Sequence, residues 1–481
     1  MMDIKLIYSS ILLGTSYAYA LAPSRNGPLR QLVEDSDTSP SAATIIDLSK
    51  DLPEDKAAME FSEGAKAMEQ AAIAEPRIRA AIVMENGKIV SSYYRQDVTP
   101  SDVSPIFSGT KSWTGLLIGL LVDDGVLSVD QTLGEMFPED AAWTDVTDGS
   151  EDFRKNVTIE ELLTMTSGLL DPPGSLVVSF FRGASEGGGS SLSDSLAYPS
   201  IGEKEKGKVT YLSLSNILSY VIFKLTGMTP GELLAERVMP HLGIQVDDYV
   251  WSKNSDGLVE NAFTGLEVTP TMLVKFGQLY MQNGLAGPHE EQRVVSQDWV
   301  EASFTRHSHL YPSSYPVQGY LGADLGAAIP VLFAEQEQGE PDAYYGYLFM
   351  GHPSKPNIYC SVGLGGTDLC IDPDIKRVVL QQTDYDYSMR DIMDTLTTSV
   401  HPAFDEVFKL VQIGLDETLS FSDSASHEVN GTSTSGEMEF PKSKSVVNAL
   451  KSEELSNSSE LIQHVSLATF FGLSAVLNFF L

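Results

Sequence analysis

The stretch that organises this sequence runs from residue 107 to residue 127 and reads FSGTKSWTGLLIGLLVDDGVL. From Trp113 to Leu127 it is almost continuously apolar over the length of a helix, which predicts a buried helix. Ser108 and Lys111 stand just before this run, three residues apart. Residues at i and i+3 share one face of a helix, so we expect the hydroxyl and the amine to meet.

This spacing suits nucleophilic catalysis. A serine hydroxyl is a weak nucleophile and needs a neighbouring base or cation. Lys111 in a dry site would lose its proton more readily and could serve as that base. With Ser108 in the first helical turn, the helix dipole would favour negative charge on its oxygen. A serine cap followed by a solvated lysine has the same spacing, but this is the only Ser-x-x-Lys in the chain.

The elements around this stretch predict a sheet built from both ends of a globular region. Two apolar, β-prone runs, 78–83 and 88–94, flank Glu85-Asn86-Gly87, a strong hairpin signal, and residues 61–74 read as a helix. Residues 130–340 show mainly helical patterns. Short strands return at 345–351, 358–363, 369–371 and 377–382, and a helix at 388–413 follows them. We therefore expect an α+β fold, an antiparallel sheet flanked by helices, with an inserted helical domain.

Composition excludes some functions. The chain has 481 residues and a formal charge of −35, from 66 acidic and 31 basic residues. Such a field repels nucleic acid, and no basic cluster or phosphate-binding loop offsets it. The histidines show no metal-ligand spacing, so we expect neither a metal nor an organic cofactor. The predicted partner is a small ester or amide substrate, and oligomeric state is left open.

Both ends of the chain carry features of an exported protein. Lys5, the apolar run 6–14 and Ala18-Tyr19-Ala20 form the pattern of a signal peptide. Sequons at Asn156, Asn430 and Asn457 suit a secreted glycoprotein. Residues 465–481 are apolar and follow a polar, small-residue stretch, which favours a GPI signal over a membrane helix. We expect a secreted or cell-surface protein, anchored through its C-terminal tail. In it Cys360 and Cys370, ten residues apart, should form a hairpin disulfide, with two free thiols as the alternative.

The predicted organisation has five parts. They are a signal peptide (1–20), an N-terminal arm (21–55), a hydrolase domain (56–412), a disordered stalk rich in Ser and Glu (413–464) and the hydrophobic tail (465–481). Within the domain, the sheet part comprises about 56–125 and 344–412, and the helical part about 126–343.

The chain resembles the serine β-lactamase and penicillin-binding-protein superfamily, in its class C-like esterase and 6-aminohexanoate-dimer hydrolase-like branch. Ser108-Gly109-Thr110-Lys111 matches the first motif, Ser-x-x-Lys. Four further stretches match the branch in the same order: 120–127, 158–169, 267–284 and 296–300. The resemblance covers roughly residues 60–412 and implies a β-lactamase/transpeptidase-like fold.

The resemblance also implies the rest of the site. Tyr211-Leu212-Ser213 matches the Tyr-x-Asn motif, with Tyr211 as a proton-transfer group. Ser213 replaces the usual Asn, and Ser215 and Asn216 are alternatives for that role. The third motif, Lys/His-Thr-Gly, corresponds to residues 361–367, where Ser361 replaces the cation.

In this wall of the cleft, the glycines Gly363 and Gly365 would let a substrate lie close to the strand. The backbone N–H of Leu364 would form the oxyanion hole with that of Ser108. Tyr345 is a further candidate for substrate contact.

These residues predict a serine hydrolase that cleaves esters or amides. Because Ser361 removes a partner for a substrate carboxylate, β-lactams and cell-wall peptides are less favoured substrates. Two alternatives stay open: a D-amino-acid peptidase or β-lactamase, and a catalytically weak surface protein that keeps the fold for binding.

Overall fold

The computed structural model describes residues 44–140, 152–169, 191–197, 207, 209, 216–310, 343–351, 355, 357–363, 365–384 and 410–422. The predicted signal peptide, the hydrophobic tail and two sequons, Asn430 and Asn457, lie outside them. In the described part, no helix is both long enough and apolar enough to cross a membrane.

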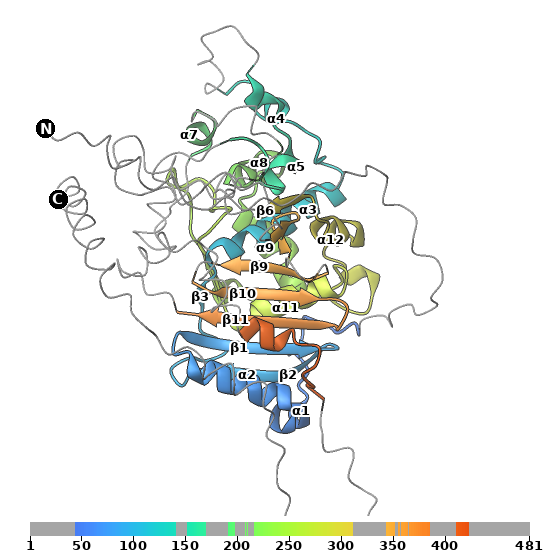
Figure 1. Ribbon diagram of the computed structural model, residues 1–481. Coiled ribbons are helices and arrows are strands. Elements are labelled where there is room, and N and C mark those ends of the chain that lie inside the picture. The colour runs from blue at the N-terminus through green and yellow to red at the C-terminus, as the bar shows by residue number, and fades with distance from the viewer. Residues whose placement is uncertain are drawn as a thin grey trace, which may run out of the picture. The chain divides into compact units, whose positions relative to one another are not determined.

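One large antiparallel sheet forms the centre of the fold. Its eight strands run in the order β2-β1-β11-β10-β9-β8-β7-β6. Figure 1 shows the blue N-terminal strands beside the orange C-terminal strands in one sheet. The strands are β1 (Ile78–Glu85), β2 (Lys88–Tyr94), β6 (Ser308–Leu310), β7 (Ala343–Tyr345), β8 (Met350–Gly351), β9 (Tyr359–Gly363), β10 (Thr367–Asp372) and β11 (Arg377–Thr383). This confirms the predicted sheet built from both ends of the globular region.

Local sequence explains two of these elements. β1 and β2 are joined at Asn86 and Gly87, whose φ angles of 51° and 78° are those of a tight hairpin turn. The predicted strand 345–351 is instead two short strands, β7 and β8. Leu348 between them has a φ of 58°, which ends the extended conformation.

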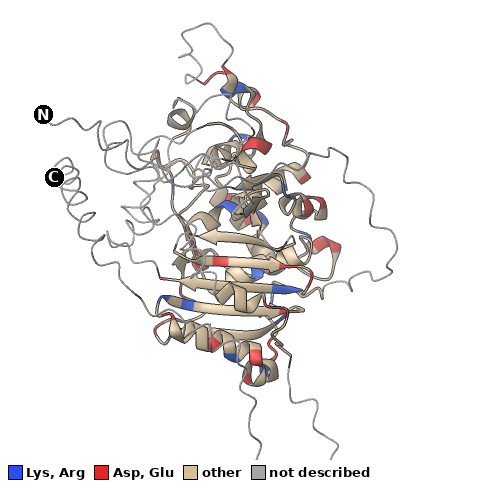
Figure 2. Cartoon of the chain, in the orientation of Figure 1, with Lys and Arg blue, Asp and Glu red and all other residues tan. Residues whose placement is uncertain are grey.

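Helices cover both faces of the sheet. On one face α2 (Glu63–Ala74) and helical residues 410–414 pack on β1 and β11. On the other, α3 (Thr110–Asp123) and α11 (Pro270–Met281) belong to the larger core, where Trp113 stacks on Phe276 with ring centroids 4.0 Å apart. Few charged positions lie on the strands, and most are on helices and loops (Figure 2). The sheet is therefore buried on both faces.

Where the structure describes residues 130–340, helices outnumber strands. The helices described there are α4 (Leu133–Met136), α5 (Ile159–Leu163), α7 (Leu192–Ala197), α8 (Asn216–Thr226), α9 (Pro230–Arg237), α10 (Met239–Leu242), α11 and α12 (Gln297–Ser303). A small sheet, β3 (Ser104–Pro105), β5 (Leu266–Val268) and β4 (Tyr249–Trp251), was not predicted. It joins the segment before Ser108 to the middle of the chain.

Packing extends beyond the predicted domain at both ends. A short helix, α1 (Lys56–Phe61), precedes α2, and Ser62 separates the two by capping α2 with its side chain. Leu48, in the predicted arm, is fully buried and donates its N–H to the carbonyl of Ala286 over 2.7 Å. Phe421, in the predicted stalk, is 1% exposed. Residues 44–55 and 413–422 thus contribute to the folded core.

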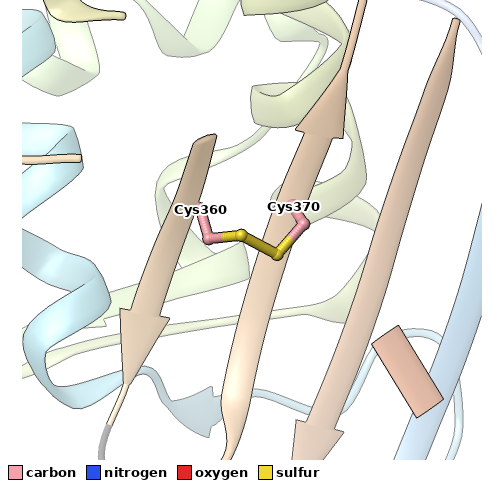
Figure 3. Close-up of a disulfide and its surroundings, with 2 residues drawn as sticks. All are labelled: Cys360 and Cys370. Carbon is pink, nitrogen blue, oxygen red and sulfur yellow. A yellow bond between two sulfur atoms is a disulfide. The ribbon is translucent and has the colours of Figure 1, made fainter. Parts of the chain in front are cut away.

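Cys360 and Cys370 form a disulfide, as predicted. They stand directly opposite each other on β9 and β10, and Figure 3 shows the bond crossing between these strands. Both cysteines are buried in the core beneath α2, at 3% and 0% exposure. The bond therefore fastens β9, the strand that ends at Gly363, to the centre of the sheet.

Candidate active site

The candidate nucleophile lies on a strained turn. Ser108 is the middle residue of a single 3-10 turn, Phe107–Gly109, which we call the nucleophile turn. The helix α3 begins only at Thr110. Ser108 therefore lies two residues before the α-helix, and the expectation that it occupies the first turn of that helix was wrong. Phe107 has a φ of 46°, a left-handed conformation that costs a bulky residue about 1–3 kcal/mol. Its ring is buried, whereas Ser108 is partly exposed.

Lys111 meets Ser108 as the sequence predicted. Its side chain is 3% exposed, and Nζ donates to Oγ of Ser108 over 3.1 Å. Nζ also contacts the carbonyl oxygen of Phe263 at 3.4 Å and lies 5.4 Å from the centre of the Phe263 ring. Burial beside a ring and a carbonyl keeps the amine next to the hydroxyl and away from bulk water.

The segment around Phe263 forms one wall of the site. The hydroxyl of Thr114 donates to the carbonyl of Ala262 over 2.9 Å, and the hydroxyl of Thr110 accepts from the N–H of Leu266 at 3.3 Å. These bonds tie the segment to the first turns of α3. Sequence reasoning missed this wall, because it acts on Lys111 through a backbone carbonyl, which no residue type signals.

Asn216 supports the same segment from the start of α8. Its side-chain oxygen accepts the N–H of Ala262 over 3.1 Å, and the side chain is 1% exposed. Tyr211, Ser213 and Ser215 lie outside the described residues. The assignment of the second motif therefore stays a prediction.

The opposite wall is the end of β9. A Cβ atom on Gly363 would collide with the carbonyl oxygen of Ile106, the residue two before Ser108. The two backbones thus touch, and only glycine permits this approach. The strand is held at a fixed distance from the nucleophile turn.

Ser361 is not placed as a substrate contact. Its hydroxyl donates to the carbonyl of Gly109 over 3.1 Å, and the residue is 3% exposed. The side chain thus fixes β9 to the nucleophile turn. Tyr345 is also corrected: it is 2% exposed and part of the main core, because short strand β7 directs its ring inward. In this arrangement neither side chain lines an open cleft.

A glycine turn follows Gly363. Gly365 and Gly366 have φ angles of 78° and 94°, and the N–H of Gly366 donates to the carbonyl of Gly363 over 3.2 Å. β11 supports the turn through two side chains. Gln381 donates to the carbonyl of Gly366 at 2.8 Å, and Thr383 donates to that of Gly365 at 2.7 Å.

Leu364, the predicted second oxyanion donor, lies outside the described residues, between Gly363 and Gly365. Within the described ranges, no group of three or more His, Cys, Asp or Glu side chains could hold a metal ion.

Comparison with known proteins shows the family and the fold. The family model "Beta-lactamase" matches residues 67–398. A 6-aminohexanoate-dimer hydrolase from Paenarthrobacter ureafaciens is 24% identical over 228 residues, which is 46% of this chain. The match spans 56% of that relative, little more than half of its length.

Among solved structures, a Bacillus anthracis protein described as a 6-aminohexanoate-dimer hydrolase shares the fold. Its TM-score is 0.51 at 15% identity, with 78% of this chain and 88% of that chain covered. The matched segment contains Ser108, Lys111 and the β9–β11 wall. The chain belongs to the beta-lactamase family.

Proposed function

We propose that the protein is a serine hydrolase that cleaves ester or amide bonds through an acyl-enzyme on Ser108. The observation that carries the proposal is the 3.1 Å contact between Lys111 Nζ and Ser108 Oγ. Lys111 is buried while Ser108 is partly exposed, so a substrate carbonyl can reach the hydroxyl but not the amine. Membership of the beta-lactamase family supports the same chemistry.

In the first half of the reaction, Ser108 Oγ attacks the carbonyl carbon. Its proton passes to Lys111 acting as a neutral amine, while the carbonyl π electrons move to oxygen. The N–H groups of Ser108 and Leu364 donate to that oxyanion. The contact between Gly363 and Ile106 holds the strand end that precedes Leu364 in the sequence against the turn that carries Ser108. The tetrahedral intermediate then collapses as the bond to the leaving group breaks. Tyr211 delivers its phenolic proton to the departing oxygen or nitrogen and regains a proton from Lys111, which returns to the neutral amine.

In the second half, water attacks the acyl carbon of Ser108. The Tyr211 and Lys111 pair takes a proton from the water, and the ester bond to Oγ breaks as Oγ regains a proton. The products are a carboxylic acid and the free enzyme. No residue is changed over the cycle.

The substrate class follows from Ser361. Its hydroxyl is bonded to Gly109, so this position offers no positive charge to a substrate carboxylate. We therefore expect esters or amides without a carboxylate near the scissile bond. The Paenarthrobacter relative is named a 6-aminohexanoate-dimer hydrolase, and two amino acids joined in a dimer are linked by an amide bond. This name supports amides as one class of substrate.

A fluorophosphonate probe tests the proposal. It should label the wild-type protein, and Ser108→Ala should abolish labelling. Ser101→Ala, an exposed serine in the preceding loop, is the matched control and should label normally. A folded wild-type protein that is not labelled would favour the binding-protein alternative. Strong labelling by a fluorescent penicillin would favour a D-amino-acid peptidase or β-lactamase.

We further propose that the protein acts at the cell surface. The disulfide between Cys360 and Cys370 supports an oxidising compartment, and the sequon residue Asn156 is exposed. Intact cells should release labelled protein when treated with a phospholipase that cleaves GPI anchors. Retention after that treatment would favour a membrane helix, and intracellular protein would contradict the proposal.

A further inference from the structure

Asp368 is a buried carboxyl group that the catalytic steps do not use. It lies on β10, two residues after the glycine turn, and is 1% exposed. Neither of its oxygens has a hydrogen-bond partner in the described part of the chain. An ionised carboxylate in such a place is costly, and a buried polar group normally finds a partner.

The residue opposite Asp368 on β11 is Gln381. The two are direct cross-strand partners, and side chains in such pairs lie on the same face within about 5.5 Å at Cβ. Gln381 Nε2 donates to the carbonyl of Gly366, whereas its Oε1 is buried without a partner among the described residues. Two unpartnered acceptor groups thus face each other beside the glycine turn. A single proton on Asp368 would satisfy both.

Among the described residues, the neighbouring charged side chains have other partners or point away from this pair. Arg377 and Asp372, four residues away on the same face, lie at the far end of the strands, and Arg377 bonds to Glu85. Arg79 of β1 bonds to Asp384. On the helices packed against the sheet, the charged residues of α2 are exposed, and residues 410–414 include no charged residue. Lys275 of α11 lies on the opposite face of the sheet and bonds to the carbonyl of Leu242.

Burial raises the pKa of Asp368 to about 8, and the nearby N–H of Gly363 opposes the shift weakly. The acid form therefore predominates at neutral pH, which supplies the missing donor.

We infer that Asp368 is a positioning residue: its protonated carboxyl donates to Gln381 Oε1 and so holds the Gln381 amide on Gly366, fixing the turn after Gly363. The inference rests on the proposed function, because this turn carries Leu364. Ionisation removes the donor and repels Oε1. The Gln381 amide can then turn its Nε2 toward the carboxylate, which releases Gly366 and loosens the oxyanion donor.

Asp368→Asn tests this inference. The asparagine amide can donate to Gln381 Oε1 as the neutral acid does, but it does not titrate. We expect kcat/KM close to wild type at pH 7. Above pH 8, kcat/KM of the wild type should fall relative to kcat/KM of the variant, because only molecules with a protonated Asp368 hold the turn in place. The fall should approach tenfold per pH unit. The matched control is Asp372→Asn, another buried carboxyl, at the far end of β10, which should leave the pH dependence of kcat/KM as in the wild type.

An infrared measurement separates this inference from the proposed function. At pH 7 the wild-type protein should show the band of a protonated buried carboxylic acid, lost above pH 9 and absent from Asp368→Asn. The band should survive in Ser108→Ala. If wild-type Ser108 is never labelled, the proposed function fails while the band still reports on Asp368. If Ser108 is labelled but the band is missing, or if the activity ratio is flat with pH, the inference is overturned.

Discussion

Two parts of the candidate site, the segment that carries Ser108 and the end of β9, are built in different ways. The helix side, Phe107 to Lys111, is local: residues three apart meet across one turn. The strand side depends on contacts across about 250 residues, namely Ser361 with Gly109 and Gly363 with Ile106. In the proposed mechanism, the helix side supplies the reacting groups, while the strand side positions the substrate. A change on the helix side should therefore abolish chemistry, and a change on the strand side should misplace it.

The largest effect should come from the helix side. Ser108→Ala removes the nucleophile, and loss of a nucleophile in serine hydrolases costs about 10⁴–10⁶ in kcat. Because the side chain is small and partly exposed, the melting temperature should change little. Turnover of a chromogenic ester, measured beside thermal unfolding, checks this. Residual hydrolysis within tenfold of wild type would rule Ser108 out.

Removal of the disulfide tests how the strand side is held. The bond closes a short loop, with a sequence separation of 10, and the chain-entropy relation gives about 3 kcal/mol of stabilisation for such a loop. Cys360→Ala with Cys370→Ala should lower the free energy of unfolding by about that amount. Chemical denaturation with and without reductant measures it. An unchanged midpoint in both conditions would show that the bond does not stabilise the strand pair.

Gly363→Ala tests the contact between the end of β9 and the backbone just before Ser108. The added methyl group collides with the carbonyl of Ile106, so β9 must move away from the nucleophile turn. Displacement by about 1 Å costs about 10²-fold in rate. Gly109→Ala is the graded comparison, because its methyl group would approach only side-chain atoms, the Ser361 hydroxyl at 3.2 Å and the Ile106 side chain at 3.4 Å. We expect kcat to fall more in Gly363→Ala; equal values would argue against the contact.

The smallest effect should follow Ser361→Ala. The change removes the hydrogen bond to Gly109 and leaves a buried carbonyl without that donor, which costs about 1–2 kcal/mol. Binding of uncharged ester substrates should not change. Unfolding in urea measures the loss of stability, and KM for a neutral ester measures substrate binding. A large rise in KM with unchanged stability would restore Ser361 as a substrate contact.

The same division explains what the sequence could predict. Asn86-Gly87, the buried helix and the Ser108–Lys111 pair are signalled by residues close together in the chain. The pairing of Cys360 with Cys370 is nearly local as well, across one turn. Sequence patterns of this range carry most of the fold.

The predictions from sequence failed where contacts with backbone atoms far away in the chain determine the structure. Strands as short as β4 and β5 give too few residues for a periodic pattern. The break between β7 and β8 lies at Leu348, whose φ of 58° is not signalled by its residue type. The role of Phe263 rests on its carbonyl, and that of Ser361 on a backbone acceptor in Gly109. None of these partners can be identified from residue type alone.

The central claim is that Ser108 carries the acyl group. Mass spectrometry of the protein quenched during turnover of a slowly hydrolysed ester tests it directly. The account predicts a mass increase equal to the acyl group, located on the peptide that contains Ser108, which disappears as the substrate is exhausted. Continued hydrolysis with the acyl group on another residue, or with no acylated protein during a measured burst, would contradict it.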